Sequence, residues 1–237
     1  MDLNVLAVNT GKEVLFVDSG MGETVKMFGE GMGHAQTNLR AAGIDPADVD
    51  YVLMTHLHAD HAFGLIDKRG AAVFPNATFC VTKSEVDEWT DEEKLKLNEF
   101  RVDWVKGTIP AVASYRDRMQ FIEEGSRIVE GVSVTMALGH SSGQCCYRFE
   151  SKGERLMAIG DTAHHHIYDL AHPGWFYSMD YDSNPDQGAS AKEKIFSEIV
   201  AGGYQLMAYH FPFPGLGKVV RRGGAYAFFP TPFNPSL

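Results

Sequence analysis

The segment Thr-His-Leu-His-Ala-Asp-His at residues 55–61 constrains this chain more than any other stretch. It directly follows residues 51–54, an apolar run that predicts a short buried strand. Alternate side chains of an extended backbone share a face, so the first two histidines can bind one cation while the aspartate and the third histidine turn toward another. A polar loop with chance histidines is the alternative, although the chain has only ten histidines in 237 residues. The segment therefore predicts a two-metal site with these ligands: His56, His58, Asp60 and His61.

Size and composition indicate a globular protein. With 237 residues, of which 44% are hydrophobic and 22% charged, we expect one domain that covers residues 1–237. No apolar run approaches the roughly 18 residues needed to cross a bilayer, so we expect no membrane partner. The first residues lack the basic and apolar regions of a secretory signal, which favours a cytoplasmic location.

Net charge and cysteine usage narrow the classes of partner. A net charge of −10 opposes binding to nucleic acid, which needs clustered Lys and Arg. The three cysteines, Cys80, Cys145 and Cys146, have neither zinc-ribbon spacing nor an even number, so we expect them reduced and buried. A small-molecule substrate is the expected partner, and a homodimer is left open.

Hydrophobic periodicity and turn residues predict similar elements in both halves of the chain. The predicted strands are residues 4–8, 13–18, 51–54, 77–82, 119–122, 132–138, 145–150, 155–159, 205–209 and 226–229. The predicted helices are residues 33–42 and 185–201, with a helical hairpin at about 83–118 that breaks near 107–110 and lies beside the site. Its bulky residues are expected mainly to pack: Trp89, Phe100, Trp104 and Tyr115. Because each half offers strands followed by a helix, we expect an α/β fold, an αββα sandwich of two mixed sheets packed face to face with helices outside.

Three further polar residues directly follow predicted strands: His140, Asp161 and His210. Alone, each would be an ordinary turn or half-buried residue. Together with the segment at 55–61 they supply seven nitrogen and oxygen ligands, enough for two cations that share one carboxylate. Asp18, at the end of a predicted strand, is either a turn former or a partner of a metal-bound histidine.

The pattern His56-x-His58-x-Asp60-His61, followed by His140, Asp161 and His210, resembles the metallo-β-lactamase superfamily of binuclear hydrolases. Residues 74–77 (Phe-Pro-Asn-Ala), 160–164 (Gly-Asp-Thr-Ala-His) and 210–217 are similar to the branch that contains methyl parathion hydrolase and related lactonases. Two departures stand out. That branch usually carries strands ahead of the position where this sequence starts, so one sheet edge is expected to be short. Gln144 also stands where relatives often have a histidine that binds no metal.

The resemblance implies a ligand assignment and a reaction. His56, His58 and His140 would hold one divalent ion, Asp60, His61 and His210 the other, and Asp161 would bridge them, with zinc as the expected metal. A hydroxide shared by the two ions would attack a carbonyl or phosphoryl centre, with Asp60 and Asp161 in the catalytic centre. His164, three residues after Asp161, is placed to donate to the leaving oxygen; a packing role for the run 164–166 is the alternative.

We therefore expect a hydrolase of neutral, apolar esters, lactones such as acyl homoserine lactones, or organophosphate triesters. The segment 210–214 supports this class, because Phe211 and Phe213 alternate with two prolines and would form a rigid apolar pocket wall together with His164. Core packing is the alternative for both phenylalanines. A glutathione-thioester hydrolase of the glyoxalase II type and a non-catalytic zinc-binding sensor are the other functions considered.

Overall fold

In the computed structural model the described residues are 1–23, 32–93, 99–176 and 181–232. They form two compact units. The N-terminal unit comprises residues 5–122, and the C-terminal unit comprises residues 123–237 together with residues 1–4. The prediction of a single domain stays a prediction.

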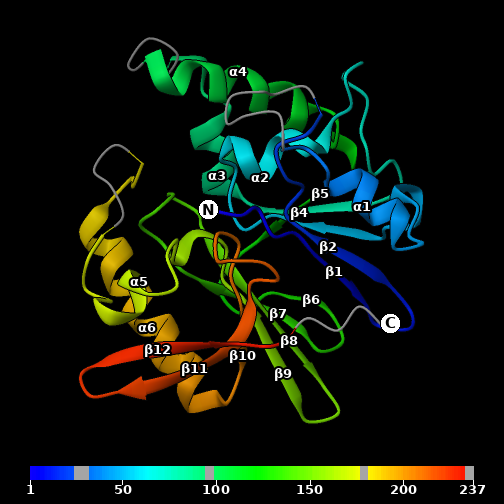
Figure 1. Cartoon of the computed structure of the whole chain (residues 1–237). Coiled ribbons are helices and arrows are strands. Elements are labelled where there is room, and N and C mark those ends of the chain that lie inside the picture. The colour runs from blue at the N-terminus through cyan, green and yellow to red at the C-terminus, as the bar shows by residue number, and fades with distance from the viewer. Residues whose placement is uncertain (24–31, 94–98, 177–180, 233–237) are drawn as a thin grey trace. The chain divides into compact units, whose positions relative to one another are not determined.

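The N-terminal unit is built on a five-stranded mixed sheet with the order β1-β2-β3-β4-β5 (Figure 1). β1 (Leu6–Asn9) and β2 (Val14–Val17) form the predicted antiparallel hairpin, and β3 (Tyr51–Leu53), β4 (Thr78–Thr82) and β5 (Met119–Ile122) continue the sheet in parallel. The helices are α1 (Ala35–Ala41), α2 (Ala59–Ala62), α3 (Lys83–Trp89) and α4 (Glu99–Ala113), with short 3₁₀ turns at Pro46–Asp48, Phe63–Leu65 and Arg116–Arg118. The two central parallel strands, β3 and β4, are nearly all buried, as strands covered on both faces must be, whereas the edge strand β5 is largely exposed.

The predicted break near residues 107–110 is wrong, because α4 runs through it without interruption. A Cβ at Gly107 would lie 2.3 Å from the ring of Phe63, so this glycine lets α4 approach the turn that carries Phe63. Pro110 lies inside the same helix. Tertiary packing against a residue 44 positions earlier thus overrides the local breaker signal. Trp89, Trp104 and Tyr115 are buried, as predicted, whereas the side chain of Phe100 lies outside the described residues.

The C-terminal unit holds a seven-stranded mixed sheet with the order β12-β11-β10-β9-β8-β7-β6. Its strands are β6 (Arg127–Val129), β7 (Val132–Met136), β8 (Cys145–Ser151), β9 (Glu154–Ala158), β10 (Gln205–Met207), β11 (Leu216–Arg222) and β12 (Ala225–Pro230). Neighbours are antiparallel except β9 and β10, which are parallel. The sequence did not predict β6 or β11. The helices are α5 (Tyr168–Ala171) and α6 (Pro185–Gly202), and a 3₁₀ turn covers Gly160–Thr162.

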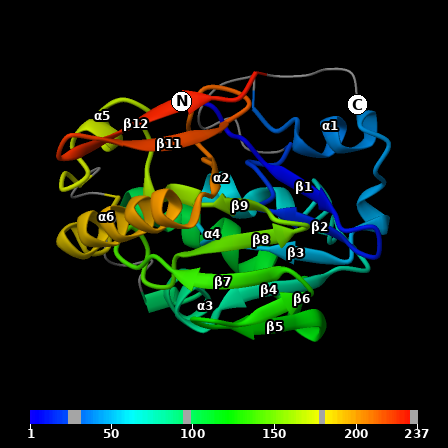
Figure 2. The ribbon, with the colours of Figure 1, turned by 90° about the horizontal axis from the view of Figure 1, so that it is seen from below.

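Helix α6 begins and packs as its sequence predicts (Figure 2). The Asn184 side chain accepts from the backbone N–H of Gln187 at 3.1 Å, which satisfies one of the free donors of the first turn. The apolar stripe of α6 joins a buried cluster with residues of β9 to β12: Ile195, Phe196, Ile199, Met157, Leu206, Val219 and Tyr226. No described helix has the length and apolar character needed to cross a bilayer.

Candidate metal centre

In the N-terminal unit the histidine segment starts two residues after the end of β3 and is held by Asp18. The buried Asp18 carboxylate accepts from the backbone N–H and the hydroxyl of Thr55, at 2.8 Å and 2.9 Å. Its Oδ2 also lies 2.9 Å from Nδ1 of His61. Of the two interpretations of Asp18, turn former or partner of a metal-bound histidine, this contact with a predicted ligand favours the second. A carboxylate in this position fixes the ring orientation and leaves Nε2 as the atom that faces outward.

The backbone between the first two histidines is fixed from both sides. The Leu57 N–H donates to Oε2 of Glu85 at 2.9 Å, and the Leu57 carbonyl accepts from the Thr108 hydroxyl at 3.4 Å. Glu85 is fully buried at the start of α3, and Thr108 is buried in α4. Neither residue was predicted from the sequence, because nothing in their own surroundings marks them. Helices α3 and α4 therefore anchor the loop that carries His56 and His58.

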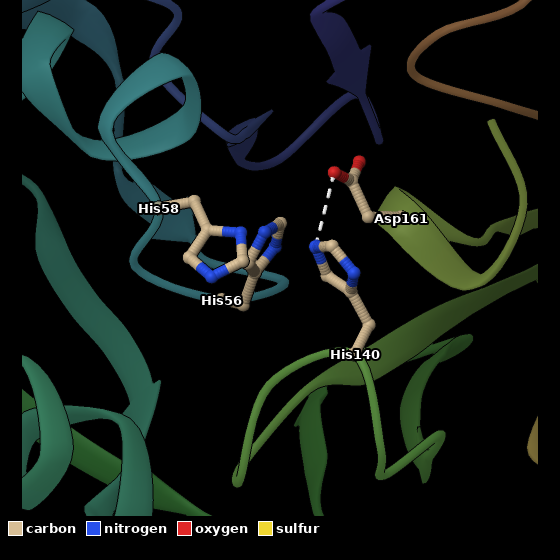
Figure 3. A group of neighbouring side chains, drawn as sticks. All are labelled: His56, His58, His140 and Asp161. Atoms are coloured by element: carbon tan, nitrogen blue, oxygen red, sulfur yellow. Dashed lines mark ion pairs between the residues drawn. The ribbon is translucent and has the colours of Figure 1, made fainter. Parts of the chain in front are cut away.

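The rings of His56 and His58 lie against each other (Figure 3), and the ring of His61 lies close to that of His56. His56 and His58 meet edge to face with centroids 4.4 Å apart, and His56 lies 4.1 Å from His61. Asp60 is partly exposed, and its Oδ2 lies 3.7 Å from Nε2 of His61. The ring of His58 also packs against two buried indoles, Trp89 at 4.8 Å and Trp104 at 5.0 Å. All four predicted ligands of the N-terminal unit thus lie within one small group.

In the C-terminal unit the predicted site residues gather around one carboxylate oxygen. Oδ2 of Asp161 lies 3.1 Å from Nε2 of His210, 3.2 Å from Nε2 of His164 and 3.3 Å from Nε2 of His140 (Figure 3 shows the last of these pairs). All four side chains are buried. Asp161, His164 and His210 form a group that could hold a metal ion, with ligand atoms within 4.8 Å of one another.

The other ring nitrogens decide what these histidines present to Asp161. Nδ1 of His210 lies 3.0 Å from the backbone carbonyl of Asp2, and Nδ1 of His140 lies 2.7 Å from Oδ1 of Asp182. A carbonyl or an ionised carboxylate only accepts, so in the neutral rings Nδ1 carries the hydrogen and Nε2 carries a lone pair. Two lone pairs that face each other repel unless a proton or a cation lies between them. Ligands of a tetrahedral zinc ion, bound at about 2.0–2.1 Å, are about 3.3 Å apart, so the donor set and its spacing fit a divalent cation.

Two of these histidines have opposite pKa shifts. Burial alone would lower the pKa of His140, but its contacts with Asp161 and Asp182 outweigh burial and raise the pKa to about 9. For His164 burial dominates over the charge of Asp161, and its pKa is lowered. In the metal-free protein at pH 7, His140 is therefore protonated, with the proton of Nε2 in the position that a cation would take beside Asp161. His164 is neutral.

The loop that carries His140 lies directly on the start of α6. The backbone carbonyls of Gly139 and His140 accept from the N–H groups of Asn184 and Ser183, at 2.7 Å and 3.0 Å. A Cβ at Gly139 would lie 2.0 Å from the backbone nitrogen of Gly188, and its φ of +132° also favours glycine. This close approach brings Asp182, which precedes α6, to the ring of His140. Asp182 was missed because its partner lies 42 residues earlier in the chain.

The two predicted pocket phenylalanines have different environments. Phe211 is fully buried in the core cluster of the C-terminal unit and meets Phe228 edge to face at 5.1 Å. Phe213 is 65% exposed. A small cavity in this unit is lined by His140, Gln144, Asp161, Thr162, His164, Phe176, Asp182 and Lys192, among others. Phe211 is thus a core residue, and of the two only Phe213 has surface to offer to a ligand.

This chain is similar to known proteins over most of its length. A profile of the metallo-beta-lactamase superfamily matches residues 3–199. The N-acyl homoserine lactonase AttM of Agrobacterium fabrum is 49% identical over 69 residues, which are 29% of this chain and 20% of that protein. The N-acyl homoserine lactonase of Bacillus cereus is 27% identical over 123 residues, 52% of this chain and 42% of that protein. The matched stretches therefore span less than half the length of these curated relatives.

Solved structures match over nearly the whole chain. The hydrolase AbOPH, described as a member of the beta lactamase superfamily, has a TM-score of 0.88 at 33% identity and covers 98% of this chain and 80% of that one. AidC, described as a dizinc quorum-quenching lactonase in complex with a product, has a TM-score of 0.87 at 24% identity with the same coverage. The expected fold class, α/β with two mixed sheets and the metallo-β-lactamase-like topology, is confirmed.

Proposed function

Because the chain belongs to the metallo-β-lactamase superfamily, we propose that it is a metal-dependent hydrolase that acts through two divalent metal ions, with zinc as the metal. The proposed ligands are His56, His58 and His140 for one ion, Asp60, His61 and His210 for the other, and Asp161 for both. The observation that carries the proposal is the pair of imidazole Nε2 atoms, those of His140 and His210, at Oδ2 of Asp161, each with its tautomer fixed by an acceptor at Nδ1. Nitrogen and oxygen atoms at this spacing fit the ligand shell of a divalent cation.

When bound, divalent ions lower the pKa of a water molecule and polarise a carbonyl oxygen. The residues of this chain would hold the ions and orient the ligand rings. Asp18 and Asp182 fix the rings of His61 and His140 through Nδ1, so that each Nε2 keeps one direction. His164 is neutral, and its ring N–H would donate to the oxygen of the leaving group as negative charge develops there. Asp60 and Asp161 supply negative charge beside the reacting atoms.

The proposed substrates are neutral, apolar esters and lactones, with N-acyl homoserine lactones first. The names of the matched relatives support the lactone, and the net charge of −10 disfavours anionic substrates. The exposed ring of Phe213 follows His210 by three residues and offers apolar surface for an acyl or aryl group. Phosphotriesters remain in the proposed range, because the same polarising chemistry applies to a phosphoryl oxygen.

The test is a substrate panel on metal-reconstituted protein: N-acyl homoserine lactones of increasing chain length, aryl esters, a phosphotriester and a glutathione thioester. The proposal expects turnover of lactones and esters that is lost on chelation and restored by zinc. Asp161→Asn serves as the inactive variant. Glu193→Gln, which removes an exposed carboxylate of α6, serves as the matched control. Turnover of the thioester alone would assign the chain to the glutathione-dependent class, and zinc binding without any turnover would assign it to non-catalytic zinc proteins.

A further inference from the structure

Helix α6 buries a charged residue in its apolar stripe. Lys192 is 3% exposed and lies on the same face as Ile195, Phe196 and Ile199, three, four and seven residues later. A lysine is almost never fully buried unless it is paired, so its partner is the informative residue.

The partner is Asp169 of α5, which is also buried. Oδ1 of Asp169 accepts from Nζ of Lys192. Its Oδ2 accepts from two successive backbone N–H groups, those of His164 at 2.8 Å and His165 at 2.7 Å. One carboxylate thus joins α6 to the backbone of the residue that faces Asp161.

Stability does not explain this arrangement well. Burying an ion pair costs desolvation energy that the pair often only just recovers, and apolar residues of similar volume are often as stable. Burial alone would raise the pKa of Asp169, but the charge of Lys192 and the bonds from Lys192, His165 and His164 outweigh it and lower the pKa. The ion pair therefore keeps Asp169 a charged acceptor, and charged acceptors form the stronger bonds to N–H groups.

His164 is not part of a helix or a strand. It lies between the 3₁₀ turn at Gly160–Thr162 and the start of α5, in a stretch without regular structure. Its Nε2 is 3.2 Å from Oδ2 of Asp161, and the ring stacks on that of His210 with centroids 5.2 Å apart and planes at 15°. A shift of about 1 Å in a group near the reacting atoms can cost about 100-fold in rate.

We infer that the buried Lys192–Asp169 pair is a positioning device that holds the His164 backbone, and with it the imidazole, in place beside Asp161. Lys192 binds Asp169, and Asp169 accepts from the backbone of His164, so the pair acts through His164. The catalytic part of this inference rests on the proposed function, and the structural part does not.

Two double variants separate positioning from stability. In D169L/K192M the acceptor is lost without leaving a buried charge unpaired. In D169N/K192Q the charges are also lost, but the asparagine oxygen can still accept from both N–H groups, as Oδ2 does now. We expect D169L/K192M to lower kcat by about 10- to 100-fold with KM and metal content unchanged, and D169N/K192Q to retain most of the kcat. In a His164→Ala background, D169L/K192M should cause no further loss of kcat, because the group it positions is gone.

A second measurement does not depend on activity. Amide hydrogen exchange at His164 and His165 should be faster in D169L/K192M than in the native protein and should lie between the two in D169N/K192Q, whose neutral acceptor forms weaker bonds. Unchanged exchange in D169L/K192M would overturn the inference, as would equal losses of kcat in the two double variants or an undiminished loss in the His164→Ala background. If the native protein hydrolyses no member of the panel, the proposed function fails, while the exchange result still decides whether the pair holds this backbone.

Discussion

Replacing Asp182 should weaken metal binding in a way that depends on pH. Asp182 is 6% exposed, and its Oδ1 lies 2.7 Å from Nδ1 of His140. A hydrogen bond to a charged group contributes about 1.5 to 3 kcal/mol, and loss of such a partner typically lowers metal affinity by about 10- to 100-fold. Asp182→Ala removes the acceptor, and Asp182→Asn keeps a weaker, neutral one. We therefore expect the larger loss of zinc affinity in Asp182→Ala.

The same carboxylate also favours the proton that competes with the metal. The contacts of His140 with Asp161 and Asp182 raise its pKa to about 9 despite burial. Below that pH, zinc must displace a proton from His140 in the native protein. Without Asp182 the pKa of His140 falls, so a smaller fraction of His140 is protonated and the proton competes less with zinc. The affinity gap between native and variant protein should therefore be full above the raised pKa and should narrow as the pH falls toward 7.

The assay is zinc competition with a chromophoric chelator at about pH 7 and about pH 10, with the pKa of His140 in the metal-free proteins followed by NMR. Glu193→Gln, an exposed carboxylate on α6, is the matched control and should leave affinity unchanged at both pH values. Two results would refute the reasoning: an affinity gap of the same size at both pH values, or no gap at the higher one. The first would mean that Asp182 does not act on the proton of His140, and the second that it does not orient a ligand.

Three other perturbations test separate parts of the proposal. Asp161→Asn should lose far more activity than His164→Ala, because it removes a shared ligand and its charge rather than one donor; equal kcat losses would show that the bridge is misassigned. Phe213→Ala should raise KM for long-acyl or aryl substrates, with little change for small ones, because the exposed ring (65%) offers apolar contact that contributes roughly 1 to 2 kcal/mol. A uniform loss of activity across all substrates, with lowered thermal stability, would make Phe213 a packing residue. The lowered pKa of Asp169 contributes stability above its unfolded pKa of 3.8, which is lost as the pH falls through the folded pKa; D169N/K192Q should therefore lose less stability on acidification, measured as Tm against pH, and a parallel decline would contradict this.

Local patterns were enough to predict much of the fold. The hairpin of β1 and β2, the buried strand β3 and the helix α6 with its Asn184 cap are encoded by alternation, turn residues and capping within a few positions. The predicted helix break near Gly107 was wrong, because that glycine makes room for the ring of Phe63, which lies 44 residues earlier in the chain. Strands β6 and β11 were missed because both are short or largely exposed and lack a clear apolar run.

The candidate site likewise contains residues that local sequence patterns predict and residues that depend on distant partners. Three of its predicted ligands directly follow apolar strands and the other four lie in one short segment, so their chemistry shows in the sequence. The acidic residues that hold the surrounding groups, Asp182, Glu85 and Asp169, do not show there, because each acts only through a distant partner or a backbone N–H.

The acceptors at Nδ1 of the predicted ligand histidines share one physical role. A metal ligand must hold its ring in one orientation before the ion arrives, and a buried acceptor at Nδ1 does this by fixing both the tautomer and the ring plane. Asp18 acts in this way on His61, Asp182 on His140, and the carbonyl of Asp2 on His210. Substitution of Asp18 or Asp182 removes such an acceptor and frees the ring that it orients, so it should lower metal affinity before it lowers the fraction of folded protein.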